Sequence, residues 1–98
     1  MELTKDLQIA AFGLIRIMEF HRIKTIKPLS DLILLAEFQD GSVKKYDVKP
    51  LIKKIPVFQM LDYVPELFNQ VRLDANGYGI IWNDEIDLSC DELYYNGK

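Results

Sequence analysis

The stretch LILLAEFQDGSVKKYDV, residues 32–48, decides the fold. An Asp-Gly pair, Asp40-Gly41, separates an apolar run from a second run with a polar centre. Asp-Gly between two strand-like runs is a strong short-range signal for a β-hairpin, because glycine readily adopts the positive φ of a tight turn. The near-continuous apolar run at 32–35 predicts a strand that is covered on both faces, in part by a helix at the N-terminus. The sequence therefore places an antiparallel hairpin at the centre of the fold.

Strand and helix signals continue on both sides of this hairpin. The preceding segment FHRIKTIKPL, residues 20–29, interleaves β-branched and basic residues, as strands do. After the hairpin, Pro50 opens one short helical segment, and VFQMLDYV between two prolines predicts another. VRLD, residues 71–74, and GYGIIW, residues 77–82, predict two further strands. Together these signals predict an α+β fold with a small, mainly antiparallel sheet of about five strands and short helices.

The end of the chain carries three agreeing signals for one short helix. Ser89 and Glu92 form the S-x-x-E pattern of a capping box. Leu88 before the cap and Leu93 in the helix suit a hydrophobic staple, and the pair 96–97, Asn-Gly, is a stop signal. The expected helix covers residues 90–95.

The first 18 residues differ from the rest of the chain. They predict an apolar helix that carries a stripe of large side chains at helical spacing: Leu7, Leu14, Ile15 and Met18. The apolar stretch is shorter than the ~20 residues that span a bilayer, and it lacks the features of a secretory signal. We therefore expect no membrane span, and a helix that is buried as a partner surface, with a homodimer as the favoured arrangement. Residues 19–98 are expected to form a single α+β domain.

Charge is divided unevenly along the 98 residues, whose formal net charge is −3. Residues 1–56 carry 10 Lys+Arg against 7 Asp+Glu, a net charge of +3, whereas residues 57–98 carry 2 against 8, a net charge of −6. Such a division can steer a charged partner without identifying it. The candidate electrostatic contacts are Arg22, Lys24, Lys44, Lys45, Lys53 and Lys54 on the basic side, and Asp84 and Glu85 on the acidic side.

The basic residues have two interpretations. They could follow the phosphates of a nucleic acid, or they could form a solvated face on which lysines protect a sheet edge. The negative total charge and the lack of a recognition-helix or RNA-binding signature favour the solvated face. Nucleic acid is thus the alternative partner and not the expected one.

The stretch DANGYGIIWNDE, residues 74–85, resembles a calcium-binding loop. Asp74, Asn76, Gly79 and Glu85 occupy the expected places. Tyr78 stands where a carboxylate or amide is required, and the next helix begins only after Ser89 rather than at the twelfth position. A hairpin with a turn at Asn76-Gly77 is the favoured interpretation, so we expect no metal.

Groups for catalysis are few. The chain has one cysteine, Cys90, which we expect to be structural because it stands at a helix start with no basic residue nearby in the sequence. Its one histidine, His21, is expected to be a surface residue. The acidic residues 84–92 could supply paired carboxylates for acid–base chemistry, but negative charge in the first turn of a helix is also favoured by the helix dipole. Trp82 and the tyrosines at 94–95 could stack on bases; core and rim positions are the favoured alternative. No catalytic residue and no cofactor are predicted.

The order of the signals resembles the bacterial family known as domain of unknown function 2442, over about residues 20–97. The matching pieces are Phe38-x-Asp40-Gly41, Tyr46-Asp47, Val57-Phe58, Leu67-Phe68, Gly79-Ile80-x-Trp82, Ile86-Asp87-Leu88 and Leu93-Tyr94. The structural signature is Asp40, Gly41, Asp47, Trp82 and Asp87, together with the capping residues Ser89 and Glu92. The resemblance implies a small α+β domain without established activity or catalytic residues, in some members encoded beside a toxin-like partner.

These observations lead to one preferred function and two alternatives. The preferred one is a cytoplasmic, non-enzymatic protein-binding module, an antitoxin-like partner of a small basic toxin encoded by a neighbouring gene. The acidic C-terminal half suits such a partner. The alternatives are a transcription-linked regulator with a basic face that contacts nucleic acid, and an unrecognised enzyme or ligand-binding domain.

Overall fold

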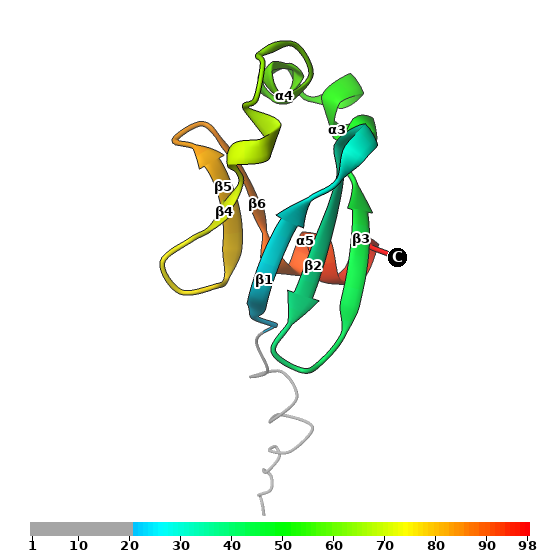
Figure 1. Cartoon of the computed structure of the whole chain (residues 1–98), viewed down its shortest axis with the longest axis vertical. Helices are drawn as coiled ribbons and strands as arrows, with labels where there is room; N and C mark the ends of the chain where they lie inside the picture. The colour runs from blue at the N-terminus through cyan, green and yellow to red at the C-terminus, as the bar shows by residue number, and fades with distance from the viewer. Residues whose placement is uncertain (1–20) are drawn as a thin grey trace, which may run out of the picture.

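The computed structural model describes residues 21–98, and the fold is given for these residues. They form two three-stranded antiparallel sheets with short helices between and after them (Figure 1). In chain order the elements are β1 (Ile23–Pro28), η1 (Ser30–Leu32), β2 (Ile33–Phe38), β3 (Val43–Asp47), α3 (Lys49–Lys54), η2 (Pro56–Gln59), α4 (Met60–Tyr63), η3 (Phe68–Gln70), β4 (Arg72–Leu73), β5 (Gly79–Asn83), β6 (Ile86–Ser89) and α5 (Cys90–Asn96).

The first sheet has the order β1-β2-β3 and contains the predicted Asp-Gly hairpin. Gly41 has a φ of 91°, in the region that favours glycine. Asp40 Oδ1 accepts a hydrogen bond from the backbone N–H of Ser42 at 2.8 Å, which fixes the turn. The hairpin prediction is therefore confirmed, and β3, with Lys44 and Lys45, is an edge strand.

Within the described residues, 21–98, the apolar run of β2 is covered on one face. Leu34, Ala36 and Phe38 are buried, whereas Ile33 and Leu35 on the opposite face are half-buried. Among residues 21–98, α5 lies behind the sheet in Figure 1 and the opposite face is turned to the viewer. The N-terminal helix, which was expected to cover part of this strand, lies outside the described residues.

The proline-flanked segments form the expected short helices. Pro50 lies at the start of α3, and the segment between Pro56 and Pro65 forms η2 and α4. The carboxylate of Asp47 accepts the backbone N–H of Lys49 at 2.9 Å and so satisfies one donor at the beginning of α3.

The second sheet corrects the predicted strand count. The prediction of about five strands in one sheet is wrong: six strands form two sheets, and the second has the order β4-β5-β6. The unpredicted strand is β6. Its turn contains no glycine, because Asn83 Oδ1 accepts the backbone N–H groups of Glu85 and Ile86 at 2.8 and 3.0 Å and closes the turn with a side chain.

The two sheets share one core around Trp82. Its side chain is 2% exposed, and its indole N–H donates to the backbone oxygen of Phe68 at 3.0 Å. The rings of Phe58 and Phe68 lie 6.3 and 6.2 Å from it, centroid to centroid. A backbone hydrogen bond of 2.8 Å from Ile23 N–H to Gly77 O also joins β1 to the β4–β5 loop. Trp82 is thus a core residue, as expected.

Helix α5 begins at the predicted cap but completes only half of the capping box. Ser89 Oγ accepts the backbone N–H of Glu92 at 3.1 Å. The Glu92 carboxylate instead accepts the hydroxyl of Tyr46 on β3 at 2.7 Å, so it ties α5 to the first sheet. Gly97 follows the helix with an extended φ of −80°, and a Cβ there would lie 2.5 Å from Leu93 O.

The predicted apolar helix at 1–18, with Leu7, Leu14, Ile15 and Met18, lies outside the described residues. Among residues 21–98, no helix is long and apolar enough to cross a membrane.

Candidate functional site

An aromatic cluster connects the start of β1, the β2–β3 turn and α5. The His21 ring stacks on Tyr94 with 3.6 Å between centroids, and its Nε2 lies 3.0 Å from the Tyr95 hydroxyl. The Tyr94 hydroxyl donates to Asp40 Oδ2 at 2.8 Å. Lys44 Nζ lies 4.9 Å from the centre of the same ring, within the range of a cation–π contact. His21 is therefore a half-buried residue at the surface, as expected, and it contacts both tyrosines.

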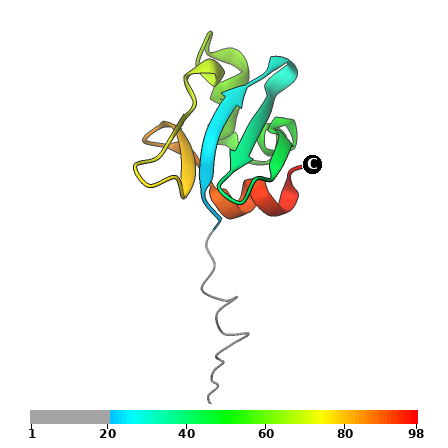
Figure 2. The same ribbon diagram turned by 60° about the horizontal axis from the view of Figure 1, so that its bottom comes forward.

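Beside this cluster lies a pocket of about 370 Å³, which we call the α5 pocket. It is lined by His21, Tyr78, Ser89, Cys90 and Asp91. A backbone hydrogen bond from Cys90 N–H to Tyr78 O, 2.8 Å long, holds the start of α5 against the β4–β5 loop. Figure 2 shows that the start of β1 and the start of α5 lie next to each other, so residues far apart in the sequence meet here.

The thiol of Cys90 is poorly suited to nucleophilic chemistry, although it shares the pocket with His21. Its residue is 2% exposed, and burial is the main cause that raises the pKa of Cys90 to about 11. The carboxylates of Asp91, Asp74 and Asp40 raise that pKa further. A cysteine nucleophile must be a thiolate, so Cys90 at neutral pH is a protonated core residue.

Asp40 and Asp47, two acidic residues of the structural signature, accept hydrogen bonds from neighbouring groups. The backbone N–H of Ser42 and the hydroxyl of Tyr94 lower the pKa of Asp40. The backbone N–H of Lys49 lowers the pKa of Asp47, and the Lys49 ammonium lies 3.0 Å from Asp47 Oδ1. Asp87, the other acidic signature residue, is exposed on β6.

The predicted basic stripe is divided among several contacts. Arg22 donates from Nε and Nη2 to Asn76 O at 3.1 and 2.9 Å and lies over the Tyr78 ring at 5.0 Å. Lys24 lies 3.9 Å from a carboxylate oxygen of Glu37. These two residues therefore help to hold the fold, and Lys44 belongs to the aromatic cluster.

Two of the predicted lysines do come together, in a second hollow of about 450 Å³. Lys45 and Lys54 line it together with Lys98, which was not predicted, and with the acidic residues Asp47 and Glu92. Lys98 reaches this place because its backbone N–H donates to Lys45 O at 2.7 Å. Lys53 is exposed on α3. We call this region the lysine hollow.

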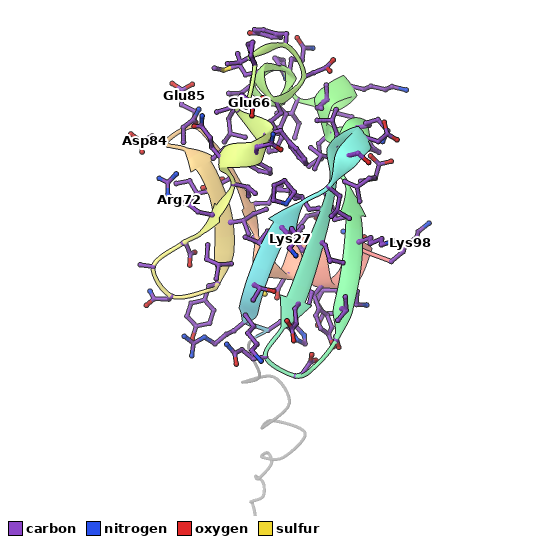
Figure 3. The ribbon with its side chains drawn as sticks, viewed as in Figure 1. Lys27, Glu66, Arg72, Asp84, Glu85 and Lys98 are labelled. Atoms are coloured by element: carbon purple, nitrogen blue, oxygen red, sulfur yellow. The ribbon has the colours of Figure 1, made fainter. Side chains whose placement is uncertain are left out.

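Asp84 and Glu85 lie together at the tip of the β5–β6 turn, where both point away from the body of the protein (Figure 3). This tip lies at the opposite end of β5 from the β4–β5 loop.

The calcium-like loop is a hairpin. Asp74 Oδ1 accepts the backbone N–H groups of Asn76 and Tyr78, both at 3.0 Å, and β4 pairs with β5. The whole of β5 separates Asp74 from Glu85, roughly 17 Å at about 3.3 Å per residue, so the two carboxylates cannot share one ion. Within residues 21–98 no group of three or more His, Cys, Asp or Glu side chains could hold a metal ion.

The hydrogen bonds of the Tyr46, Tyr94 and Tyr95 hydroxyls were not predicted from the sequence. Their partners lie 46 to 74 residues away along the chain, and no local pattern encodes such contacts. One local signal was available: two adjacent tyrosines follow a capped helix start. Because adjacent residues of a helix point in different directions, one of these rings can contact the body of the protein while the other is exposed.

The family comparison agrees with the sequence resemblance. A family model described as "Protein of unknown function (DUF2442)" matches residues 23–98. No curated protein and no solved structure matched the chain. Because the match covers most of its length, the chain belongs to the DUF2442 family.

Proposed function

We propose that the protein is a cytoplasmic, non-enzymatic protein-binding module that holds a small basic protein at the α5 pocket. Its partner is the product of a neighbouring gene, in the manner of an antitoxin and its toxin. The observation that carries this proposal is the exposure of two tyrosines beside the pocket: Tyr95 is 67% exposed and Tyr78 is 44% exposed.

Exposed tyrosines beside a hollow are a typical basis for protein recognition. A tyrosine offers a large, rigid contact area with a polar tip, and tyrosines are over-represented among the residues that dominate binding energy. The Tyr95 hydroxyl lies 3.0 Å from His21 Nε2, so its ring is partly pre-positioned. Less conformational entropy is then lost on binding.

The local charge favours a basic partner. Asp91 lines the pocket, and Asp74 and Asp40 act with it on the Cys90 thiol. Three carboxylates act on this one buried atom and favour a basic partner here, since complementary charge speeds association, although the Lys44 ammonium over the Tyr94 ring offsets part of this charge. Arg22 also offsets it at the Tyr78 side, so the Asp91 side is the expected place for the partner's cation.

The test uses the adjacent gene's product and a matched pair of tyrosine variants. Tyr95→Ser should weaken binding by about tenfold or more, as expected for a central aromatic contact. Tyr63→Ser is the control, because Tyr63 on α4 is 68% exposed but belongs to a different surface. Tyr95→Phe should retain most of the affinity, since the ring remains.

Charge is tested separately. Asp91→Asn should slow association and reduce its dependence on salt. The proposal fails if the adjacent gene's product does not bind, or if Tyr95→Ser and Tyr63→Ser bind it equally well. Isothermal titration gives the affinities, and stopped-flow fluorescence gives the association rates.

A nucleic-acid-contacting face is the alternative, and the lysine hollow is the observation that favours it. Lys45, Lys54 and Lys98 come from three separate segments and border the same hollow, where their three side-chain cations outnumber the carboxylates of Asp47 and Glu92. Phosphate contacts would make binding to random DNA fall steeply with salt. The double variant Lys45→Gln/Lys54→Gln should then reduce the salt slope, whereas Lys27→Gln on β1 should not. Absence of DNA binding at low salt would exclude this alternative.

A further inference from the structure

The open edge of β3 is flanked by a hollow on each face of the first sheet. Within residues 21–98, β3 is the last strand of the order β1-β2-β3, so only β2 pairs with it. The lysine hollow borders β3 on the side of α3 and α5. Another hollow of about 420 Å³, which we call the Ile33 hollow, borders it on the opposite face. The residues shared by both hollows are Lys45, Asp47 and Lys98.

The strand register directs alternate backbone groups of β3 to this edge. Val48 N–H donates to Leu32 O just beyond the paired strands, and the alternation of antiparallel pairing then assigns the backbone groups of 44 and 46 to β2. The groups that point to the open edge, over about 13 Å, are those of Val43, Lys45 and Asp47. Lys45 O agrees with this direction, because it accepts Lys98 N–H at 2.7 Å. Lys98, labelled in Figure 3, lies beside β3 on this side. The edge thus already accepts a backbone donor from another segment.

The lysine hollow contains cations that have no ion-pair partner within residues 21–98. The lysines that form ion pairs there are Lys24 and Lys49, and Lys49 binds Asp47 at 3.0 Å. The other carboxylate of the hollow, Glu92, accepts the Tyr46 hydroxyl at 2.7 Å. The remaining cations of this hollow are those of Lys45, Lys54 and Lys98. The lysine hollow is therefore suited to negatively charged side chains.

The Ile33 hollow is suited to apolar side chains. Leu29 and Ile33 line it, and the carboxylate of Asp31 is paired with Lys49 at 3.1 Å. Val43, which is 56% exposed, adds apolar surface on the same face of the sheet. Successive side chains of a strand point to opposite faces, so a strand added beside β3 would direct alternate side chains to the two hollows.

We propose that the edge of β3 binds an extended peptide of alternating acidic and apolar residues as an added antiparallel strand. The acidic side chains enter the lysine hollow, and the apolar ones cover the Ile33 hollow. Backbone hydrogen bonds to Val43, Lys45 and Asp47 provide affinity and replace the single bond from Lys98, whereas the two hollows select the side chains. This surface adjoins the end of α5 at Asn96, away from the α5 pocket at Ser89 and Cys90.

Charge favours such a peptide over a second copy of this chain. If two β3 strands paired antiparallel about Lys45, the lysines at 44 and 45 of each copy would lie opposite those of the other, and like charges directly opposite are destabilising. Lysine on an edge strand protects against this kind of pairing. Nucleic acid would use the cations but not the backbone groups of the edge, and the net charge of −3 opposes it.

The charge requirement is tested by fluorescence anisotropy with the full-length protein. The probe is a fluorescein-labelled peptide with the sequence Glu-Val-Glu-Val-Glu-Val-Glu, which should bind, and its analogue with lysine in place of each glutamate should not. Lys45→Gln/Lys54→Gln should weaken binding at least severalfold. Lys24→Gln/Lys27→Gln on β1 removes the same charge from the opposite edge of the sheet and should leave the affinity nearly unchanged.

The backbone requirement is tested with two N-methylated forms of the same peptide. In an antiparallel added strand, the residues opposite Lys45 direct their amides to the edge and share its outward face, where the valines belong. Methylation of the valine amides should therefore abolish binding, and methylation of the glutamate amides should not. In the protein, the unmethylated peptide should slow hydrogen exchange at the Lys45 amide and leave the Tyr46 amide, which is bonded to β2, unchanged.

The alternative outcomes are distinct. Loss of binding on methylation of the glutamate amides alone would support an added strand that runs parallel to β3. Equal affinity of the two methylated peptides, or no binding of the unmethylated one, would overturn the proposal. Binding of random duplex DNA without binding of the peptide would assign the lysines to nucleic acid. Protection of Lys45 that rises with protein concentration in the absence of peptide would assign the edge to a second copy. None of these results bears on the basic partner proposed for the α5 pocket, because the substituted residues lie outside that pocket.

Discussion

The first and second sheets have the same number of strands and the same antiparallel order, but their turns are held differently. The β2–β3 turn relies on the positive φ of Gly41 and on the Asp40 carboxylate. The β5–β6 turn is closed by the amide of Asn83, and the β4–β5 loop by the Asp74 carboxylate. Backbone freedom at glycine leaves a clear mark in a sequence, whereas a side chain that caps its own turn is much harder to recognise.

The sheets also differ in length and charge. β1, β2 and β3 have five or six residues each, whereas β4 has two and β6 has four. Such short strands cannot support a sheet by pairing alone, so the second sheet depends on Trp82 in the shared core. Its connections carry acidic residues, while the first sheet carries lysines, and the α5 pocket lies where the two regions meet.

The largest expected effect comes from removing the shared core residue. Trp82→Ala should destabilise the protein by about 3–5 kcal/mol, because it leaves a cavity and the Phe68 carbonyl without its donor. Phe38→Ala, from the buried face of the first sheet, should cost a similar amount. Urea unfolding followed by circular dichroism measures both changes.

The same two variants test whether the sheets unfold together. With one core, hydrogen exchange should accelerate in β2 and in β5 for either variant. If Trp82→Ala exposes only β4, β5 and β6 while β1–β3 remain protected, the sheets are separate cooperative units, and the account of a shared core is wrong.

The part of the fold that the sequence predicted is the part with local signals. The Asp40-Gly41 hairpin, the proline-flanked helices and the Ser89 cap each depend on residues within a few positions of one another. The unpredicted strand β6 depends on Asn83, whose side chain closes the turn before it. The division into two sheets depends on Trp82, which contacts residues far away in the sequence.

The candidate site was less predictable for a related reason. His21, Tyr78, Tyr95 and the start of α5 are separated by long stretches of chain, and only the completed fold brings them together. The sequence did suggest that Cys90 is structural, and burial together with three carboxylates accounts for its raised pKa. Side-chain chemistry was thus partly predictable from residue type, but proximity was not.

Gly77 and Gly41 both have a positive φ, but they differ in the space around an added side chain. Gly77 has a φ of 76°, and a Cβ there would lie 2.9 Å from Ile23 O, at the junction of the sheets. Gly77→Ala should therefore cost about 2–4 kcal/mol, the sum of backbone strain and a forced shift of β1. Gly41→Ala, with no atom within 4 Å of the added Cβ, should cost only about 1 kcal/mol. Thermal unfolding compares them, and equal losses would contradict the close approach at Gly77.

A smaller effect is expected where α5 is tied to the first sheet. Tyr46→Phe removes the hydroxyl that donates to Glu92 at 2.7 Å and should cost about 1 kcal/mol, since water can reach the half-buried carboxylate. Tyr95→Phe is the control and should change stability by less than about 0.5 kcal/mol, because the residue is largely exposed. A loss from Tyr46→Phe no larger than that of the control would mean that this bond does not hold α5.

The smallest expected effect is the acid sensitivity of the β2–β3 turn. The backbone N–H of Ser42 and the Tyr94 hydroxyl hold the pKa of Asp40 below its usual value of about 3.9. Since the folded protein favours the carboxylate, this stabilisation is complete above the unfolded pKa and is lost as the pH falls through the lower folded pKa. Asp40→Asn should thus make the unfolding free energy less dependent on pH below about pH 4, and Tyr94→Phe should do so to a smaller degree, because the Ser42 bond remains. Urea titrations at pH 4 and at pH 2.5 measure these slopes. If Asp40→Asn loses as much stability between the two pH values as the unsubstituted protein, the acid sensitivity arises elsewhere, and the carboxylate of this turn contributes through its shape rather than its charge.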